Sequence, residues 1–252
     1  MFKGFYNLTS GMLTQGRMLD VISNNMANVA TPGYKASRYT ASTFQEVMWQ
    51  LVGNKTKRYT ELGEQSWITA PSQLYTDFTQ GPFDQTGLTL DFALEGAGYF
   101  GIRRDDETVY YTRGGSFSLD EEGYLSLPGQ GRVLGIDRQP IQLTTDKITS
   151  DGYGGLFTEN GGFLGRIGVF TFEDEAEMLD KNAQALFTTE EENVEVGAGR
   201  MHHMMVEQSN TDWVREMTQM ISAQRAYQSA AEITKIYDTL VTRITTEIGR
   251  AT

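Results

Sequence analysis

The segment MFKGFYNLTSGMLTQGRMLDVISNNMANVATPGYK, residues 1–35, decides how the rest of the chain is organised. Apolar residues recur in it at alternating intervals of three and four, with one polar member: Phe5, Leu8, Met12, Gln15, Leu19, Ile22, Met26 and Val29. This spacing is typical of the contact seam of a coiled-coil helix. The helix should end near Ala30, because Thr31-Pro32-Gly33 joins a residue before proline to a glycine.

A helix with one apolar stripe needs a second helix to cover that stripe. The other long helical pattern lies near the C-terminus, where neither proline nor glycine occurs from Thr211 to about Ile248. The three-four spacing returns there at Ala223, Ala226, Ala230, Ile233, Tyr237, Leu240 and Ile244. We therefore predict that the two ends of the chain pair.

The chain between the two predicted helices favours β-structure. Alternating, β-branched and aromatic runs separated by glycine turns begin at Gly81, and Phe117–Leu119 and Tyr124–Leu125 flank a turn typical of a hairpin. Within residues 34–80 a short amphipathic helix is expected around Thr43–Val52, from the spacing of Phe44, Val47, Met48 and Leu51. The rest of that segment is expected to be extended.

These patterns predict an α+β fold, with long N- and C-terminal helices pairing as a coiled-coil stalk and a central, mainly antiparallel β domain. Residues 1–34 and 208–252 would form the terminal helical coiled-coil domain. Residues 35–80 would form an extended connecting segment with a short helix, and residues 81–207 the central β domain.

The charge of the chain is unevenly distributed. Its 252 residues include 33 acidic and 21 basic side chains, a net charge of −12. Residues 1–40 have a net charge of +3 and residues 208–252 a net charge of zero, so residues 41–207 carry −15. Such an acidic chain is a poor partner for nucleic acid. An acidic middle with near-neutral ends suits a protein whose ends pack together and whose middle faces solvent.

Composition also limits the chemistry of the chain. It contains no cysteine, which excludes disulfides, thiol nucleophiles and thiolate metal sites. No run of about 18 apolar residues occurs, so no membrane span is expected. The N-terminal segment has no solid apolar block and no small-residue cleavage site, so we expect no cleavable secretory signal.

The candidate catalytic and metal-binding residues have simpler explanations. Asp105-Asp106 and Glu121-Glu122 fall at predicted turns, where solvated loops are expected. His202-His203 are neighbours on a predicted strand, so their rings should point to opposite faces. We therefore expect no enzyme activity, no catalytic or metal-binding residues and no cofactor.

Several segments together resemble one family. Asn24-Asn25-Met26-Ala27-Asn28-Val29-Ala30-Thr31-Pro32-Gly33-Tyr34-Lys35 resembles the N-terminal signature of the bacterial flagellar basal-body rod and hook proteins. Ser209-Asn210, Glu216–Ile221 and Gln224–Gln228 resemble their C-terminal signature. The segments Gln80-Gly81, Thr86-Gly87, Leu90–Leu94, Gly96–Phe100 and Tyr111–Phe117 resemble the β body of the rod proteins in particular. The resemblance is to the distal or proximal rod protein more than to the hook protein, which carries further inserted domains.

The resemblance implies a structural protein of the bacterial flagellum basal body, located outside the cytoplasm. Such a protein is exported unfolded by the flagellar type III export apparatus. It then polymerises helically through its terminal helices into the hollow drive shaft that transmits torque to the hook. The implied partners are copies of itself and the neighbouring flagellar rod and hook proteins.

On this interpretation the expected subunit-interface residues lie on both helices. Asn24, Asn25 and Asn28 are expected to bond across subunits, with Gln224 and Arg225 as partners. The full set is Phe5, Leu8, Met12, Leu19, Ile22, Asn24, Asn25, Met26, Asn28, Val29, Met217, Ile221, Gln224, Arg225, Tyr227, Ile233, Tyr237, Leu240 and Ile244.

Two interpretations of other classes remain open. One is a monomeric extracellular binding module with a β domain. The other is a hydrolase domain on a helical stalk, which would need a cleft lined by converging carboxylates.

Overall fold

The computed structural model describes residues 2–43, 47–52, 59–65, 69–104, 108–172, 175, 180–181, 186–189, 195–197 and 199–248. The chain divides into two compact units. The helical unit comprises Met1–Met26, Ser37–Tyr75 and Trp213–Thr252, and the β unit comprises Ala27–Ala36 and Thr76–Asp212. The fold is α+β, as predicted, with two long helices that pack together and a central antiparallel β domain.

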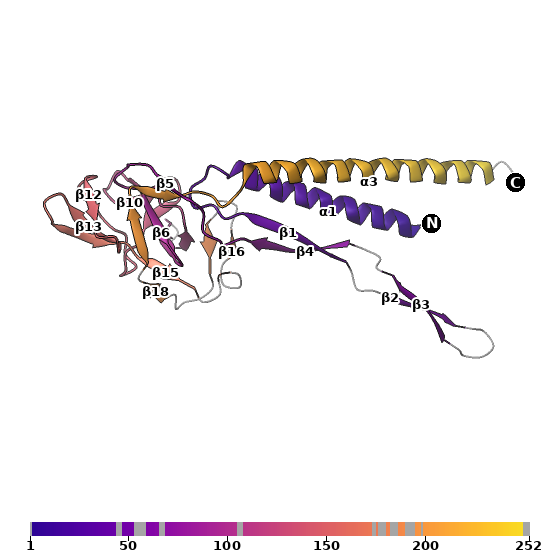
Figure 1. Ribbon diagram of the computed structural model, residues 1–252, viewed down its shortest axis with the longest axis horizontal. Helices are drawn as coiled ribbons and strands as arrows, with labels where there is room; N and C mark the ends of the chain where they lie inside the picture. The colour runs from indigo at the N-terminus through magenta and orange to yellow at the C-terminus, as the bar shows by residue number, and fades with distance from the viewer. Residues whose placement is uncertain are drawn as a thin grey trace. The chain divides into compact units, whose positions relative to one another are not determined.

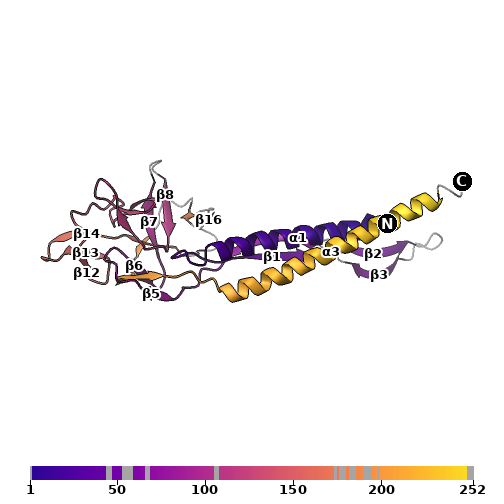
Figure 2. The same cartoon turned by 90° about the horizontal axis from the view of Figure 1, so that it is seen from above.

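Two helices run side by side in the helical unit (Figures 1 and 2). They are α1, Phe2–Ala27, and α3, Trp213–Ile248. Side-chain interactions between described residues join them. The amide of Asn25 donates to Glu216 over 3.4 Å, and the hydroxyl of Thr234 lies 3.7 Å from the sulfur of Met12. The predicted pairing of the two ends is therefore confirmed.

The segment between Ser37 and Tyr75 forms β ribbons. Strand β1, Ser37–Thr43, pairs with β4, Thr69–Thr76, and β2, Val47–Val52, pairs antiparallel with β3, Tyr59–Gln65. The short helix expected around Thr43–Val52 is wrong for residues 47–52, and residues 44–46 lie outside the described part of the chain. Val47, Trp49 and Val52 are β-branched or aromatic, and strand pairing outweighs the spacing that suggested a helix.

The β unit is built around an antiparallel sheet with the strand order β16-β17-β8-β7-β11-β10-β9, in which β15 pairs with both β7 and β18. Its strands are β7, Tyr99–Arg103; β8, Val109–Thr112; β9, Ser118–Leu119; β10, Leu125–Leu127; β11, Gly131–Val133; β15, Val169–Thr171; β16, Asp180–Lys181; β17, Phe187–Thr188; and β18, Glu195–Gly197. The predicted hairpin is confirmed, because β9 and β10 pair antiparallel with Leu119 opposite Leu125.

Smaller sheets complete the β unit. Three strands pair in the order β12-β13-β14, while β19 pairs with β6 and β20 with β5. Their bounds are β5, Phe83–Gln85; β6, Phe92–Glu95; β12, Ile148–Ser150; β13, Gly155–Thr158; β14, Phe163–Arg166; β19, Arg200–His203; and β20, Met205–Glu207.

The described residues of the β unit include two buried apolar clusters. One gathers around Phe92, Phe100 and Leu156, and the other around Tyr99 and Phe187. The aromatic rings of the second cluster meet edge to face, with the centroids of Tyr99 and Phe187 5.6 Å apart. None of the helices in the described part of the chain has both the length and the apolar character that crossing a bilayer requires.

Candidate subunit interface

The seam predicted for α1 lies on its better covered side. Ile22 is 3% exposed, and Leu8, Met12, Leu19 and Met26 are partly buried. Near the start of the helix Phe5 is 39% exposed. Val29 follows the end of α1 and is partly buried in the β unit. The hydrophobic spacing therefore identified the covered face of this helix.

The covered line of α3 differs from the predicted seam. Its buried or partly buried positions in the described part of the helix are Glu216, Gln219, Met220, Ala223, Ala230, Ala231, Thr234, Tyr237 and Val241. This line shares Ala223, Ala230 and Tyr237 with the prediction, but Ala226, Ile233, Leu240 and Ile244 are exposed. The prediction followed apolar residues, whereas the pair with α1 also uses polar ones such as Glu216 and Thr234.

As a result α3 presents uncovered apolar side chains. Ile233, Ile236, Leu240 and Ile244 are spaced by three and four residues and therefore share one side of the helix. Among the large exposed apolar residues of α3, the exposed fraction ranges from 38% for Tyr227 to 71% for Val214. The large exposed apolar residues of α3 are Trp213, Val214, Met217, Ile221, Tyr227, Ile233, Ile236, Leu240 and Ile244.

The three asparagines near the end of α1 have different surroundings. Asn25 is buried, and its amide donates to the carbonyl of Ser37 over 2.7 Å while its oxygen accepts from the Ser37 N–H over 2.9 Å. Asn28 accepts from the hydroxyl of Thr31 in the following turn. Asn24 is exposed. Asn25 thus has an intramolecular role that the sequence did not reveal.

Gln224 and Arg225, the partners expected for the asparagines, are exposed on α3. Met217 and Ile221 precede them on the same helix and are 48% and 43% exposed. Bonding of Gln224 and Arg225 across subunits stays a prediction.

A buried ion cluster lies in the β unit, and two of its members, Lys35 and Arg113, come from segments that showed the family resemblance. The ammonium of Lys35 lies 2.7 Å from the carboxylate of Glu207, and both side chains are fully buried. The guanidinium of Arg113 lies 3.5 Å from the other oxygen of Glu207. Burial lowers the pKa of Lys35, and the Glu207 carboxylate opposes this effect. Sequence reasoning missed this cluster, because its members come from three distant segments.

Among the residues that the structure describes, no three His, Asp or Glu side chains gather in a way that could hold a metal ion. His202 lies 3.0 Å from a carboxylate oxygen of Glu95, while His203 lies 2.7 Å from the carbonyl of Thr89 and stacks on Phe92. The two rings therefore have different neighbours, as neighbours on a strand should. Of the carboxylate pairs, Glu122 pairs with Arg132 at 2.7 Å, and Asp105-Asp106 lies outside the described residues.

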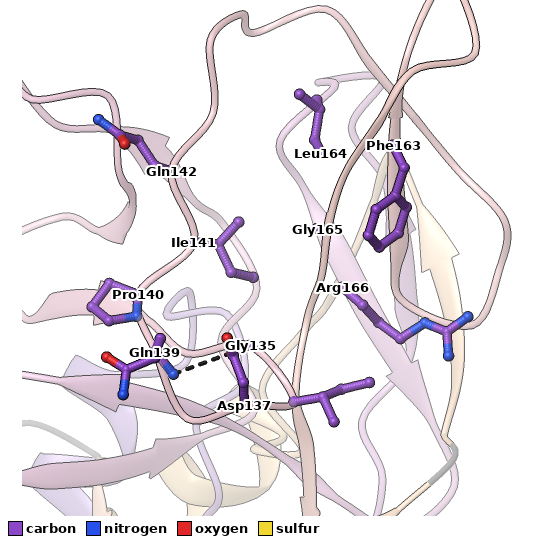
Figure 3. A pocket seen from close by; sticks show the side chains of 11 residues that line it. Gly135, Asp137, Gln139, Pro140, Ile141, Gln142, Phe163, Leu164, Gly165 and Arg166 are labelled. Carbon is purple, nitrogen blue, oxygen red and sulfur yellow. Dashed lines mark hydrogen bonds between the residues drawn. The ribbon is translucent and has the colours of Figure 1, made fainter.

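Two surface grooves in the β unit bear on the hydrolase interpretation. The first, of about 540 Å³, is lined by apolar side chains such as Ile141 and Phe163 and by a single carboxylate, Asp137 (Figure 3). The second, of about 660 Å³, includes Asp91 and Asp146. Asp91 is buried and Asp146 exposed, so the two carboxylates lie in different surroundings.

Comparison with known proteins points to one family along the whole chain. The model described as "Flagella basal body rod protein" matches residues 5–35, and "Flagellar hook protein FlgE/F/G D1 domain" matches residues 93–199. "Flagellar basal body rod FlgEFG protein C-terminal" matches residues 204–246. These matches include most of α1, most of the β unit and most of α3.

Full-length relatives agree with these models. The flagellar basal-body rod protein FlgG of Bacillus subtilis is 32% identical over 265 residues, covering 96% of this chain and 97% of the relative. The flagellar hook-basal body complex protein FlhO of the same organism is 30% identical, covering 99% and 100%. The flagellar basal-body rod protein FlgF of Caulobacter vibrioides is 29% identical, covering 92% of each.

Proposed function

Since the chain belongs to the flagellar basal-body rod protein family, we propose that it polymerises helically with copies of itself through the exposed faces of its terminal helices. Family membership makes it a structural subunit of the rod, located in the flagellar basal body, where it associates with other rod and hook proteins. The relatives are rod proteins by name, and a structural role needs no catalytic group.

The observation that carries polymerisation is the apolar side of α3. Ile233, Ile236, Leu240 and Ile244 are each 43% to 60% exposed in the single chain. Fully burying such a side chain contributes about 1.5–3 kcal/mol, so roughly half of that is still available from each. A contiguous exposed apolar patch of this kind typically marks an interaction surface. Copies of the chain would cover it.

The spacing on α3 also supports a coiled coil within each subunit. Most covered positions from Glu216 to Val241 fall on the three-four alternation of a heptad seam, although Tyr227, between Ala223 and Ala230, is exposed. Small residues there allow a close approach of the neighbouring helix. We assign residues 1–34 and 208–252 to this assembly domain, residues 35–80 to the connection and residues 81–207 to an outer β domain.

Charge supports the same arrangement. The helical unit holds eleven basic and eight acidic residues, whereas the β unit holds ten basic and 25 acidic residues. Near-neutral helical units pack against their copies with little repulsion, and an acidic β unit favours solvent. A contact that joins different surfaces of successive copies produces an open filament. That filament would be the hollow shaft that transmits torque to the hook.

Export in an unfolded state is consistent with the composition of α1. Gly11 and Gly16 lie inside this helix, and each lowers helix stability by roughly 1 kcal/mol relative to alanine. A helix that is weak in isolation orders when it packs, so α1 would order as it pairs with α3. We propose that the flagellar type III export apparatus carries the chain before this step.

Electron microscopy of the concentrated protein tests the proposal. The unaltered chain should form helical filaments, and Ile22→Asp, which places a charge at a buried seam position, should form none and should not support swimming. Ser23→Asp adds the same charge at the neighbouring exposed position and should assemble normally. A chain that stays monomeric at high concentration, or filaments from Ile22→Asp, would contradict assembly through the terminal helices.

A further inference from the structure

The chain passes between the helical unit and the β unit four times, and residues beside these crossings bind one another within the β unit. The N–H of Gly33 donates to the carbonyl of Glu207 over 2.7 Å. The N–H of Asp77 donates to the carbonyl of Ala36 over 2.8 Å. Three segments that are distant in sequence are therefore joined at one place.

Asn210 connects all three segments with its side chain. Its oxygen accepts from the N–H of Ala36 over 2.7 Å. Its amide nitrogen donates to the carbonyl of Asp77 over 2.7 Å and to that of Thr79 over 3.0 Å. One side chain thus binds the backbone beside two crossings, at residues 36–37 and 75–76. Asn210 itself is close to a third crossing, between residues 212 and 213.

The buried pair of Lys35 and Glu207 connects the same segments. The ammonium of Lys35 donates to the carbonyl of Thr79 over 2.8 Å as well as to Glu207. The carboxylate of Glu207 also accepts from the N–H of Gly81 over 2.9 Å. A buried ion pair contributes little stability compared with a packed apolar pair, but its hydrogen bonds fix a geometry that apolar groups would not.

We propose that Lys35, Glu207 and Asn210 are positioning residues that clamp the chain to the β unit at its crossings. This inference rests on the proposed function in one respect, because the clamp acts on the twist that an assembled shaft carries. With the crossings bound to one another, torque that arrives along one segment is shared by the others. The crossing clamp, defined as these three residues, would therefore limit twisting within each subunit.

Amide hydrogen exchange in the full-length chain tests the clamp, using Asn210→Ala, which removes its hydrogen bonds without leaving a buried charge. The amides of Ala36 and Asp77 should exchange at least tenfold faster than in the unaltered chain. The amide of Leu134, which donates to Gly101 in the core of the β unit, should change less than twofold. Equal acceleration at Leu134, or none at Ala36 and Asp77, would overturn the clamp.

Gln208→Ala is the matched control. The side chain of Gln208 donates to Asp84 over 3.1 Å, whereas Ala36, Asp77 and Thr79 bind the side chain of Asn210, so this variant should leave the amides of Ala36 and Asp77 unchanged. Acceleration equal to that in Asn210→Ala would also overturn the clamp, since it would show that any nearby truncation loosens the segment.

Cryo-electron microscopy of filaments tests whether the clamp limits twisting within each subunit. In filaments of Asn210→Ala, the spread in the twist within each subunit should be at least twofold wider than in filaments of the unaltered chain. Filaments of Gln208→Ala should show no such increase. An equal spread would overturn the mechanical role. Failure of the unaltered chain to form filaments would instead overturn the proposed function, and the exchange comparison would still decide whether the clamp holds the crossings.

Discussion

Replacing Leu240 on α3 tests the proposed interface at one defined position. Leu240 is 52% exposed, so assembly would bury about half of its side chain and contribute roughly 1 kcal/mol. Leu240→Ala should therefore raise the critical concentration for filament formation about fivefold. Leu240→Asp additionally buries an unpaired carboxylate, which costs several kcal/mol, so its critical concentration should rise more than about 100-fold.

Sedimentation of filaments over a concentration series measures these critical concentrations, and circular dichroism of the monomer checks that α3 is intact. Thr239→Asp is the control, because Thr239 is exposed on the adjacent position and its hydroxyl donates only to the Lys235 carbonyl one turn earlier. Thr239→Asp should assemble nearly normally. An unchanged critical concentration for Leu240→Asp, or equal losses for both variants, would refute the interface.

Three other predictions concern single residues. Glu207→Ala leaves two buried cations without their carboxylate, so the free energy of unfolding of the β unit should fall by about 3–5 kcal/mol in chemical denaturation. Gly16→Ala meets no atom within 4 Å and should stabilise α1 by about 1 kcal/mol, seen as a higher melting temperature of the helical signal. Partial desolvation acts to raise the pKa of Asp120, but hydrogen bonds from the Tyr124 amide and from Arg132 outweigh it and hold that pKa below 3.8. The stability from Asp120 is therefore present above pH 3.8 and lost as the pH falls through the lower folded-state pKa. Acid titration should show a smaller loss in Asp120→Asn.

The sequence predicted those features whose signal lies within a short stretch of the chain. The spacing of Leu8, Met12, Leu19 and Ile22 identified the covered side of α1, and the turn residues after Leu119 identified a hairpin. Both signals are contained within a short stretch, so neither depends on the rest of the fold.

Features that depend on distant partners were not predicted. Val47, Met48 and Leu51 fit a helical spacing, but pairing with Tyr59–Gln65 makes this segment a strand. On α3 the covered line includes Glu216, whose partner Asn25 lies 191 residues away. From the sequence alone, a charged residue such as Glu216 is expected to face solvent, because its partner Asn25 cannot be identified.

The buried pair of Lys35 and Glu207 shows the same limit for the candidate positioning site. Lysine and glutamate are rarely buried unless paired, and nothing near either residue in the sequence indicates the other. The segment that resembles the family ends at Lys35, but the resemblance gives no reason for a lysine there. The division into assembly, connecting and outer domains stays a prediction, since it concerns how these parts behave in an assembled shaft.

The two terminal helices differ in length, with 26 residues in α1 and 36 in α3. At a rise of 1.5 Å per residue this is a difference of about 15 Å, and α3 extends past the first turn of α1 (Figures 1 and 2). A subunit with an overhang at one end has a front and a back, so a shaft built on it grows with a fixed polarity and has two unlike tips.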